Sequence, residues 1–191
     1  MEGKARQEMT ARRGLMLGRF QPFHNGHLAL AKQILSECDE LIIAIGSAQY
    51  NYIDRDPFTA GERISMIHAA LSEGGADLSK CFIIPIPNDD NNARWLAYLR
   101  SMVPAFDVLY SGNDFVKHLA LSQDPRIEIR RPRFANKAQF NATHIRRLII
   151  AGKPWKHLVP RAVAKAMEHV GGTERIRLLA ATTSDSQPQK W

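Results

Sequence analysis

The sequence predicts an α/β fold: a Rossmann-like doubly wound parallel sheet with a helical C-terminal region. Short apolar runs alternate with segments that carry apolar residues at helical spacing, a pattern typical of strands joined by crossover helices. The run ELIIAIGS at residues 40–47 is nearly continuous in apolar residues, as expected of a parallel strand covered on both faces. From Thr143 onwards the pattern is mostly helical, so the C-terminal region is expected to add helices to the sheet.

Local patterns predict the individual elements. A first strand at residues 14–18, GLMLG, leads through a polar turn into a helix with apolar side chains at positions 28, 31, 34 and 35. A second helix begins near Thr59, which forms a capping-box pattern with Glu62. Further strands are predicted at residues 81–87, 106–112 and 127–129, and further helices at residues 95–102, 115–121, 143–152, 160–170 and 173–180.

The chain is expected to form one domain, because 191 residues with an apolar fraction of 45% suit a single soluble core. The domain is expected at residues 14–181, between a flexible N-terminal extension at 1–13 and a flexible tail at 182–191. Cys38 and Cys81 are too few for a disulfide scaffold and are expected in or near the core. No run suits a signal peptide or a membrane span, so a cytoplasmic protein without a membrane partner is expected.

The net charge indicates which ligands the protein is expected to bind, and two missing motifs exclude two classes of nucleotide chemistry. Lys and Arg number 26 against 19 Asp and Glu, which favours polyanionic partners such as nucleotides, nucleic acid or a membrane surface. No glycine-rich dinucleotide turn follows the first strand, and no phosphate loop ending in Gly-Lys-Ser/Thr occurs. Hydride transfer by the usual route and P-loop hydrolysis are therefore not expected.

The stretch GRFQPFHNGH at residues 18–27 predicts a phosphate site. It joins the first strand to the first helix and gathers Arg19, His24 and His27 at the helix start. Asn25 is expected to cap the helix, and Gly26 to let a ligand approach the backbone. The first amides of a helix are unpaired and lie at the positive end of its dipole, so they favour anions.

Two other interpretations of the histidines were weighed. Zinc is disfavoured, because the helical metalloprotease pattern places its histidines four residues apart with a glutamate between them. A single histidine in a turn is usually a solvated polar residue. Two histidines with Arg19 before them and a helix after them favour the phosphate site. The polar loops GSAQYN and SGND follow two other predicted strands, so all three loops are expected at one sheet edge.

His24-Asn25-Gly26-His27 matches the H-x-G-H signature of the nucleotidylyltransferase superfamily. Together with RDPFTAGER at 55–63, YSGN at 110–113 and THIRR at 143–147, the chain resembles the archaeal-type nicotinamide-mononucleotide adenylyltransferases from about residue 14 to 180. The resemblance implies a nucleotidylyltransferase domain that converts ATP and nicotinamide mononucleotide to NAD and pyrophosphate with Mg²⁺. It also suggests a homo-oligomer, a hexamer in that family.

The resemblance also implies roles for individual residues. The catalytic residues would be His24, His27 and Arg146. The ATP-binding residues would be Arg19, Phe20, Gly26, Ser111, Gly112, Asn113, Thr143 and Arg146, and the mononucleotide-binding residues Arg55, Asn92 and Trp95. Asn141 departs from the family pattern, which usually has serine there; asparagine can also cap a helix.

Some of these residues also have ordinary structural explanations. Trp95 is expected to stack on the nicotinamide ring, although a core position was the alternative. Arg55 is expected to contact phosphate, although a solvated loop arginine is the common case. Asp89 and Asp90 form an acidic turn that is more often solvated than metal-binding, so Mg²⁺ is expected on the ATP phosphates and its protein ligands stay unknown.

Other functions remain open at this point. A sister enzyme, a phosphopantetheine adenylyltransferase or a cytidylyltransferase, would share the histidines but not Trp95 or YSGN in this form. A non-catalytic nucleotide-binding or nucleic-acid-binding protein is suggested by the net charge and by RIEIRRPRF at 126–134. No basic stripe interleaved with aromatic residues supports a single-strand platform, so no nucleic-acid partner is expected.

Overall fold

The computed structural model describes residues 11–133 and 140–185 of the chain. Its centre is one sheet of five parallel strands in the order β3-β2-β1-β4-β5. All five predicted strands are present: β1 (Arg13–Gly18), β2 (Glu40–Ile45), β3 (Cys81–Pro85), β4 (Val108–Tyr110) and β5 (Glu128–Arg130). The parallel α/β prediction is therefore confirmed.

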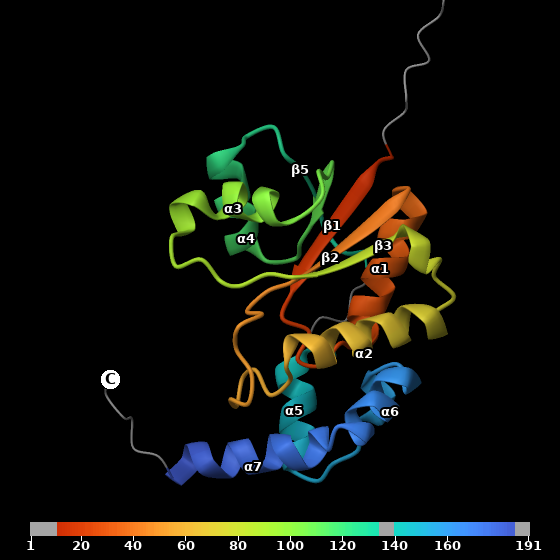
Figure 1. Cartoon of the computed structure of the whole chain (residues 1–191), viewed down its shortest axis with the longest axis vertical. Helices are drawn as coiled ribbons and strands as arrows, with labels where there is room; N and C mark the ends of the chain where they lie inside the picture. The colour runs from red at the N-terminus through yellow and green to blue at the C-terminus, as the bar shows by residue number, and fades with distance from the viewer. Residues whose placement is uncertain (1–10, 134–139, 186–191) are drawn as a thin grey trace, which may run out of the picture.

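Helices cover both faces of the sheet, as the doubly wound prediction requires. α1 (Asn25–Glu37) and α2 (Ala60–Glu73) lie on one side, and α3 (Trp95–Met102) and α4 (Asp114–Gln123) on the other (Figure 1). Side chains of β2 alternate between two core clusters: Ile43 belongs to the cluster under α1 and α2, and Ile42 to the cluster under α3 and α4. This two-sided burial explains why residues 41–45 are apolar without interruption.

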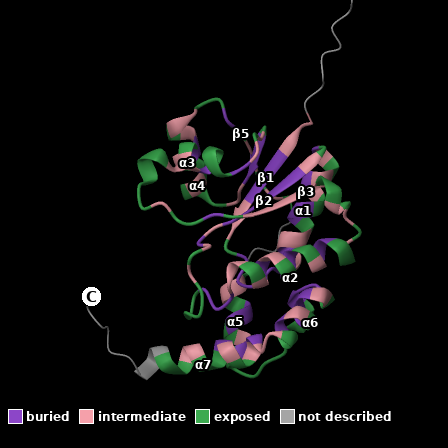
Figure 2. Ribbon diagram, in the orientation of Figure 1, coloured by how far each residue is buried: buried purple, intermediate pink, exposed green. Residues whose placement is uncertain are grey.

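The C-terminal region is helical, as predicted, and extends the core on one side of the sheet. It contains α5 (Ala142–Ile150), α6 (Arg161–His169) and α7 (Gly172–Asp185). α6 packs on α2, and α5 packs on α7 (Figure 1). Ile149 and Val163 from these helices are buried in the same cluster as residues of α1 and α2. Buried positions colour parts of α5 and α6 in Figure 2. Short 3₁₀ turns occupy Leu78–Lys80, Asn92–Arg94 and Lys156–Leu158.

The expected domain boundaries differ slightly from the element bounds. β1 begins at Arg13, and α7 continues to Asp185, four residues past the expected end of the domain at 181. Residues 1–10 and 186–191, which hold most of the expected extension and tail, lie outside the described residues. Cys38 is buried and Cys81 half-buried, as expected for residues in or near the core. In the described part of the chain, no helix is long and apolar enough to cross a membrane.

The strand order reverses direction at β1. From β1 the chain proceeds to β2 and β3 on one side, then crosses to β4 and β5 on the other. Ligands of open α/β sheets bind at such a switch point, beyond the carboxyl ends of the strands. The loops after β1 and β4 therefore border the expected binding position.

Candidate active site

Two cavities meet at the carboxyl end of β1. The histidine cavity, about 680 Å³, is lined by His24, His27, Phe140 and the loop at 111–113, among others. The tryptophan cavity, about 570 Å³, is lined by Arg19, Asn92, Trp95 and residues of the loops after β2 and β3. Leu17 and Asn113 line both cavities. The predicted catalytic histidines thus share one cavity with three predicted ATP-binding residues, Ser111, Gly112 and Asn113. The predicted mononucleotide residues Asn92 and Trp95 line the other cavity together with Arg19, which was predicted to bind ATP.

His24 and His27 hold each other in place. His24 is the N-cap of α1, and its Nδ1 accepts the backbone N–H of His27 at 3.3 Å. The backbone N–H of His24 in turn donates to Nδ1 of His27 at 3.2 Å, and the two rings stack with centroids 3.5 Å apart. The expectation that Asn25 caps this helix is wrong, because Asn25 is the first helical residue and donates instead to the carbonyl of His157.

This arrangement determines the tautomer of both imidazoles. A ring nitrogen that accepts a hydrogen bond carries no proton, so each Nδ1 is bare and each Nε2 carries the hydrogen. Burial lowers the pKa of His24 to about 4. Burial also lowers the pKa of His27 well below its ordinary value, and the charge of a protonated His24 would lower it further. Both side chains are therefore neutral N–H donors near pH 7 and not cations.

The start of α1 is less open than the sequence suggested. The amide of His27 is already bonded to His24, whereas the amides of Asn25 and Gly26 donate to no partner among the described residues. A Cβ on Gly26 would lie 2.9 Å from Cβ of Phe140. Close packing against Phe140 therefore explains this glycine, and the space expected for a ligand is filled there.

Phe20 supports a histidine and does not face a cavity. It is buried, and its ring meets the His27 ring edge-on with centroids 4.8 Å apart. Among the described residues that line the two cavities, Phe20 is absent. A direct contact between Phe20 and ATP stays a prediction, and the structure places the Phe20 ring against the imidazole of His27.

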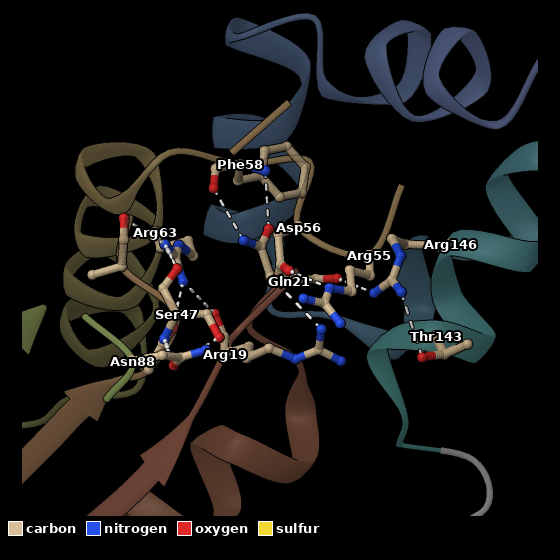
Figure 3. A network of polar contacts seen from close by, with 12 residues as sticks. Arg19, Gln21, Ser47, Arg55, Asp56, Phe58, Arg63, Asn88, Thr143 and Arg146 are labelled. Carbon is tan, nitrogen blue, oxygen red and sulfur yellow. Dashed lines mark hydrogen bonds and ion pairs between the residues drawn. The ribbon is translucent and has the colours of Figure 1, made fainter. Parts of the chain in front are cut away.

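Arg146 projects from the second turn of α5 into the interior. Its Nη1 donates to the carbonyl of Gln21 at 2.8 Å, and its Nη2 lies 3.5 Å from Oγ1 of Thr143 (Figure 3). Arg147, the next residue, is exposed. Asn141 caps α5 by accepting the amide of Thr143 at 2.8 Å, so this departure from the family pattern keeps a capping function.

Arg63 is a site residue that the sequence analysis did not assign. It is fully buried on α2, and it donates to the carbonyls of Arg19, Gly46 and Ser47 at 2.9–3.1 Å (Figure 3). Two residues beside these carbonyls, Phe20 and Ser47, have φ near +55°, a conformation that persists only where surrounding contacts enforce it. Arg63 therefore ties together the carboxyl ends of β1 and β2.

Gln21 was also missed, and it links three segments of the site. Its side chain donates to the carbonyl of Phe58 and accepts the amide of Phe58 at 3.0 and 2.9 Å, while its own carbonyl accepts from Arg146. Gln21 and Arg63 both lie within the quoted motifs GRFQPFHNGH and RDPFTAGER. Both residues were therefore present in the motifs, but the spacing of a motif along the chain does not reveal which of its residues are buried.

The tryptophan cavity combines an aromatic ring with polar groups. Trp95 begins α3, is half-buried, and lines the cavity together with Asn92 and Asp90. Asp89 accepts two hydrogen bonds from Arg94, at 2.6 and 3.1 Å, and this pairing lowers the pKa of Asp89. Within the described ranges, no group of three or more His, Cys, Asp or Glu side chains could hold a metal ion.

Arg55 lines neither cavity among the described residues, but it is linked to Arg19. Its Nε lies 3.3 Å from Oδ2 of Asp56, and Oδ1 of Asp56 lies 3.4 Å from Nη1 of Arg19. The guanidinium of Arg55 also lies over the ring of Tyr50. A contact between Arg55 and the mononucleotide stays a prediction.

The basic run at 126–133 is largely neutralised. Arg130 and Arg133 both pair with Glu37, at 2.7 and 2.9 Å. Arg131 pairs with Asp114 at 2.6 Å, and Arg126 lies 3.9 Å from Asp124. These arginines therefore do not form an uncompensated positive stripe.

Comparison with known proteins agrees with this geometry. Residues 15–148 match the cytidylyltransferase-like family model. The chain is 46% identical to a nicotinamide-nucleotide adenylyltransferase of Caldivirga maquilingensis and 47% identical to one of Pyrobaculum arsenaticum, with 94% of this chain and 99% of each relative covered.

Solved structures show the same fold. A bifunctional NMN adenylyltransferase/ADP ribose pyrophosphatase from Francisella tularensis superposes with a TM-score of 0.73 at 24% identity; 92% of this chain covers 54% of that chain, about half its length. Another structure of that protein, in complex with AMP and a manganese ion, gives a TM-score of 0.69 at 22% identity and a cover of 53% of that chain. From its sequence relatives and its fold, the chain belongs to the cytidylyltransferase-like family and, within it, to the nicotinamide-nucleotide adenylyltransferases.

Proposed function

We infer that this chain transfers AMP from ATP to nicotinamide mononucleotide and produces NAD and pyrophosphate. The observation that carries the assignment is the junction of two cavities at the end of β1, with paired histidine donors in one and Trp95 in the other. ATP is assigned to the histidine cavity and the mononucleotide to the tryptophan cavity. Their reacting phosphates then meet near Leu17 and Asn113, which line both.

The reaction is a single in-line displacement. A phosphate oxygen of the mononucleotide forms a bond to the α-phosphorus of ATP, and the bond from that phosphorus to the bridging oxygen of the leaving pyrophosphate breaks. The attacking phosphate monoester is largely dianionic near neutral pH, since its second pKa is about 6. No general base is required. Catalysis consists of aligning two anions and stabilising the charge that develops on pyrophosphate.

The histidine cavity supplies donors suited to that charge. The Nε2–H groups of His24 and His27 are neutral and need no change of protonation during the reaction. Arg146 is buried and lines neither cavity among the described residues; its guanidinium, held by Gln21 and Thr143, is proposed to add positive charge from behind the site. Preorganised donors of this kind stabilise a transition state without reorganising at the moment of reaction.

Mg²⁺ is proposed as the metal cofactor, bound to the phosphates of ATP. The described residues provide no carboxylate cage, and this fits an ion that takes its ligands mainly from substrate phosphates and water. When bound, the ion would neutralise part of the phosphate charge. The F. tularensis protein is described in complex with AMP and manganese, which supports a divalent ion in a protein of this fold.

An assay of pyrophosphate release tests the assignment. Purified protein with ATP and Mg²⁺ should release pyrophosphate with nicotinamide mononucleotide and form NAD in equal amount. Nicotinic acid mononucleotide, phosphopantetheine, and CTP with a polyol phosphate are assayed in parallel to separate the sister activities. Release with one of the latter two but not with nicotinamide mononucleotide would contradict the proposal.

Binding to nucleic acid is the second candidate, and pairing of the arginines in the basic run disfavours it. Tight binding of single-stranded or duplex DNA at about 0.2 M salt, without pyrophosphate release, would favour it over the enzyme. We further propose a homo-oligomer in the cytoplasm, a hexamer by resemblance to the family, with no nucleic-acid or membrane partner. Light scattering of the purified protein measures the oligomeric state.

A further inference from the structure

One carboxylate lies inside a cluster of arginines, of which Arg19 lines the tryptophan cavity. Asp56 is fully buried, and it is the only buried Asp or Glu in the described part of the chain. Its Oδ1 lies 3.4 Å from Nη1 of Arg19, and its Oδ2 lies 3.3 Å from Nε of Arg55 (Figure 3). The side chains of Arg19 and Arg55 are 44% and 64% exposed, so both guanidiniums remain accessible to an anion.

The backbone around Asp56 is anchored. Its amide donates to the carbonyl of Ile53 at 3.0 Å, and Ile53 donates back at 3.4 Å. Two residues later, Phe58 exchanges two hydrogen bonds with the buried side chain of Gln21. The carboxylate therefore has a defined position relative to the loop that follows β1, from which Arg19 projects.

Asp56 also acts on the two buried arginines. Burial lowers the pKa of Arg63 and of Arg146. The negative charge of Asp56 opposes that shift in Arg63, and the charges of Asp54 and then of Asp56 oppose it in Arg146. One carboxylate thus faces four guanidiniums, two of them exposed. The excess of positive charge suits a polyphosphate substrate.

One oxygen of Asp56 is incompletely bonded. Oδ2 is buried and accepts no hydrogen bond from the described residues, although Arg55 is near enough to form an ion pair. A buried acceptor without a hydrogen bond is unusual in native proteins and calls for an explanation. A carboxylate that holds exposed arginines ready for another anion provides an explanation.

We propose that Asp56 is a positioning residue that holds Arg19, at the wall of the tryptophan cavity, beside Arg55, so that the two guanidiniums can meet the phosphate of the mononucleotide. It does not touch substrate. The inference rests on the adenylyltransferase function proposed above. The competing account is that Asp56 only balances the charge of buried Arg63 and contributes to folding.

The test compares Asp56→Asn with Glu174→Gln. Both variants remove one negative charge, but Glu174 is exposed at the start of α7, and its side chain bonds only to Thr173 among the described contacts. If Asp56 positions the arginines, Asp56→Asn lowers kcat at least tenfold, and Glu174→Gln leaves kcat within twofold. Inorganic pyrophosphate, used as a probe in calorimetry, should bind Asp56→Asn as tightly as the unaltered protein or more tightly, because the cluster has gained positive charge.

A purely structural role of Asp56 predicts different results in these two measurements. A parallel loss of kcat and of pyrophosphate affinity in Asp56→Asn, or a kcat within twofold of the unaltered protein, would overturn the proposal. If the asparagine variant fails to fold, Asp56→Glu serves, since it keeps the charge and moves the carboxylate by one methylene. Positioning predicts the same tenfold loss of kcat for Asp56→Glu, whereas a counter-charge for Arg63 predicts retained kcat. An unaltered protein that releases no pyrophosphate with the mononucleotide would instead refute the proposed function.

Discussion

His24 and His27 illustrate how two polar residues can be made suitable for phosphate without becoming charged. Each ring accepts the other's backbone amide through Nδ1, so each presents Nε2–H. Burial keeps both rings neutral by lowering their pKa values. A neutral donor loses no proton at working pH, which is why we assign charge stabilisation and not proton transfer to this pair.

Substitution of His27 tests this role. Removing one preorganised donor typically lowers turnover by about 10²–10³. His27→Ala should lower kcat by such a factor with smaller changes in KM, because the interaction is strongest in the transition state. His27→Asn should recover part of the rate, since an amide donates a hydrogen bond but does not exchange protons near neutral pH. Steady-state kinetics would contradict the role if Asn is no better than Ala and the pH–rate profile loses an ionisation.

Trp95 lines the tryptophan cavity but is only half-buried, so its main contribution is expected in ligand binding. Stacking of a base on an aromatic ring is worth about 1–3 kcal/mol. Trp95→Ala should weaken the binding of nicotinamide mononucleotide by roughly tenfold or more and leave the affinity for ATP nearly unchanged. Calorimetry with each ligand separately measures both. An equal loss for the two ligands, or a large drop in melting temperature, would show that Trp95 serves packing.

Arg146 and Arg147 form a matched pair, because they are adjacent, carry the same charge and differ in direction. Adjacent residues of a helix point about 100° apart. Arg146 is buried beside Gln21, and Arg147 is exposed. A hydrogen bond to a charged group contributes about 1.5–3 kcal/mol, so Arg146→Ala should lower kcat/KM for ATP by roughly tenfold or more. Arg147→Ala should stay within threefold, and the reverse order in kinetic assays would contradict the placement of Arg146.

At the scale of elements, the start of α1 does two tasks with one pair of residues. His24 and His27 form the capping box of this helix, and they also line the histidine cavity. The same two residues therefore couple helix stability to the state of the site. This coupling gives the folded protein a sensitivity to acid that can be measured without substrate.

Acid should destabilise the protein through His24. In the unfolded chain this histidine binds a proton near its ordinary pKa of 6.5, but in the folded protein only near 4. The contribution of His24 to stability is therefore complete above pH 6.5 and is lost as the pH decreases towards 4, on the order of 3 kcal/mol for this residue. His27, whose pKa is also lowered by burial, adds to the loss below pH 6.5. His24→Asn should show a shallower loss between pH 6.5 and 4 in urea denaturation. Equal pH slopes for the two proteins would contradict the burial of a neutral His24.

The carboxylate of Glu37 affects stability in a lower pH range than His24 does. Hydrogen bonds, first from Arg130 and then from Tyr110 and Gln33, hold the pKa of Glu37 at about 2. Its contribution to stability is present above its ordinary pKa and is lost only as the pH falls from about 4.5 towards 2. The acid effect of His24 can therefore be read at higher pH without interference from Glu37.

At the scale of the whole molecule, periodicity predicted the order of strands and helices, because each element depends on local residues. The uninterrupted apolar run of β2 reflects two-sided burial, which is itself a property of the doubly wound sheet. The roles of Gln21 and Arg63 depend on contacts with segments that are distant in sequence. A motif can contain such residues, but its spacing does not distinguish a buried arginine from an exposed one.

The cap of α1 shows a second limit of prediction from the sequence. Asn25 has the usual chemistry of an N-cap, yet the cap is His24, whose ring accepts an amide in the same way. Residue preferences are averages, and the pairing of His24 with His27 is a tertiary arrangement that overrides them. Similarly, the sequence favoured Gly26 as a point where a ligand approaches the backbone; the structure places Phe140 and the His24 ring close to it, and a contact between Gly26 and ATP stays a prediction.

The stereochemical course at phosphorus tests the central claim of direct, in-line attack most directly. The substrate is a single diastereomer of ATP with sulfur at the α-phosphorus, and the configuration of the thio-NAD product is determined by ³¹P NMR. Because Nδ1 of each histidine accepts a hydrogen bond and Nε2 carries a proton, neither ring offers a free lone pair to phosphorus. One displacement predicts inversion of configuration. Retention would require two displacements through a covalent intermediate and would contradict the mechanism.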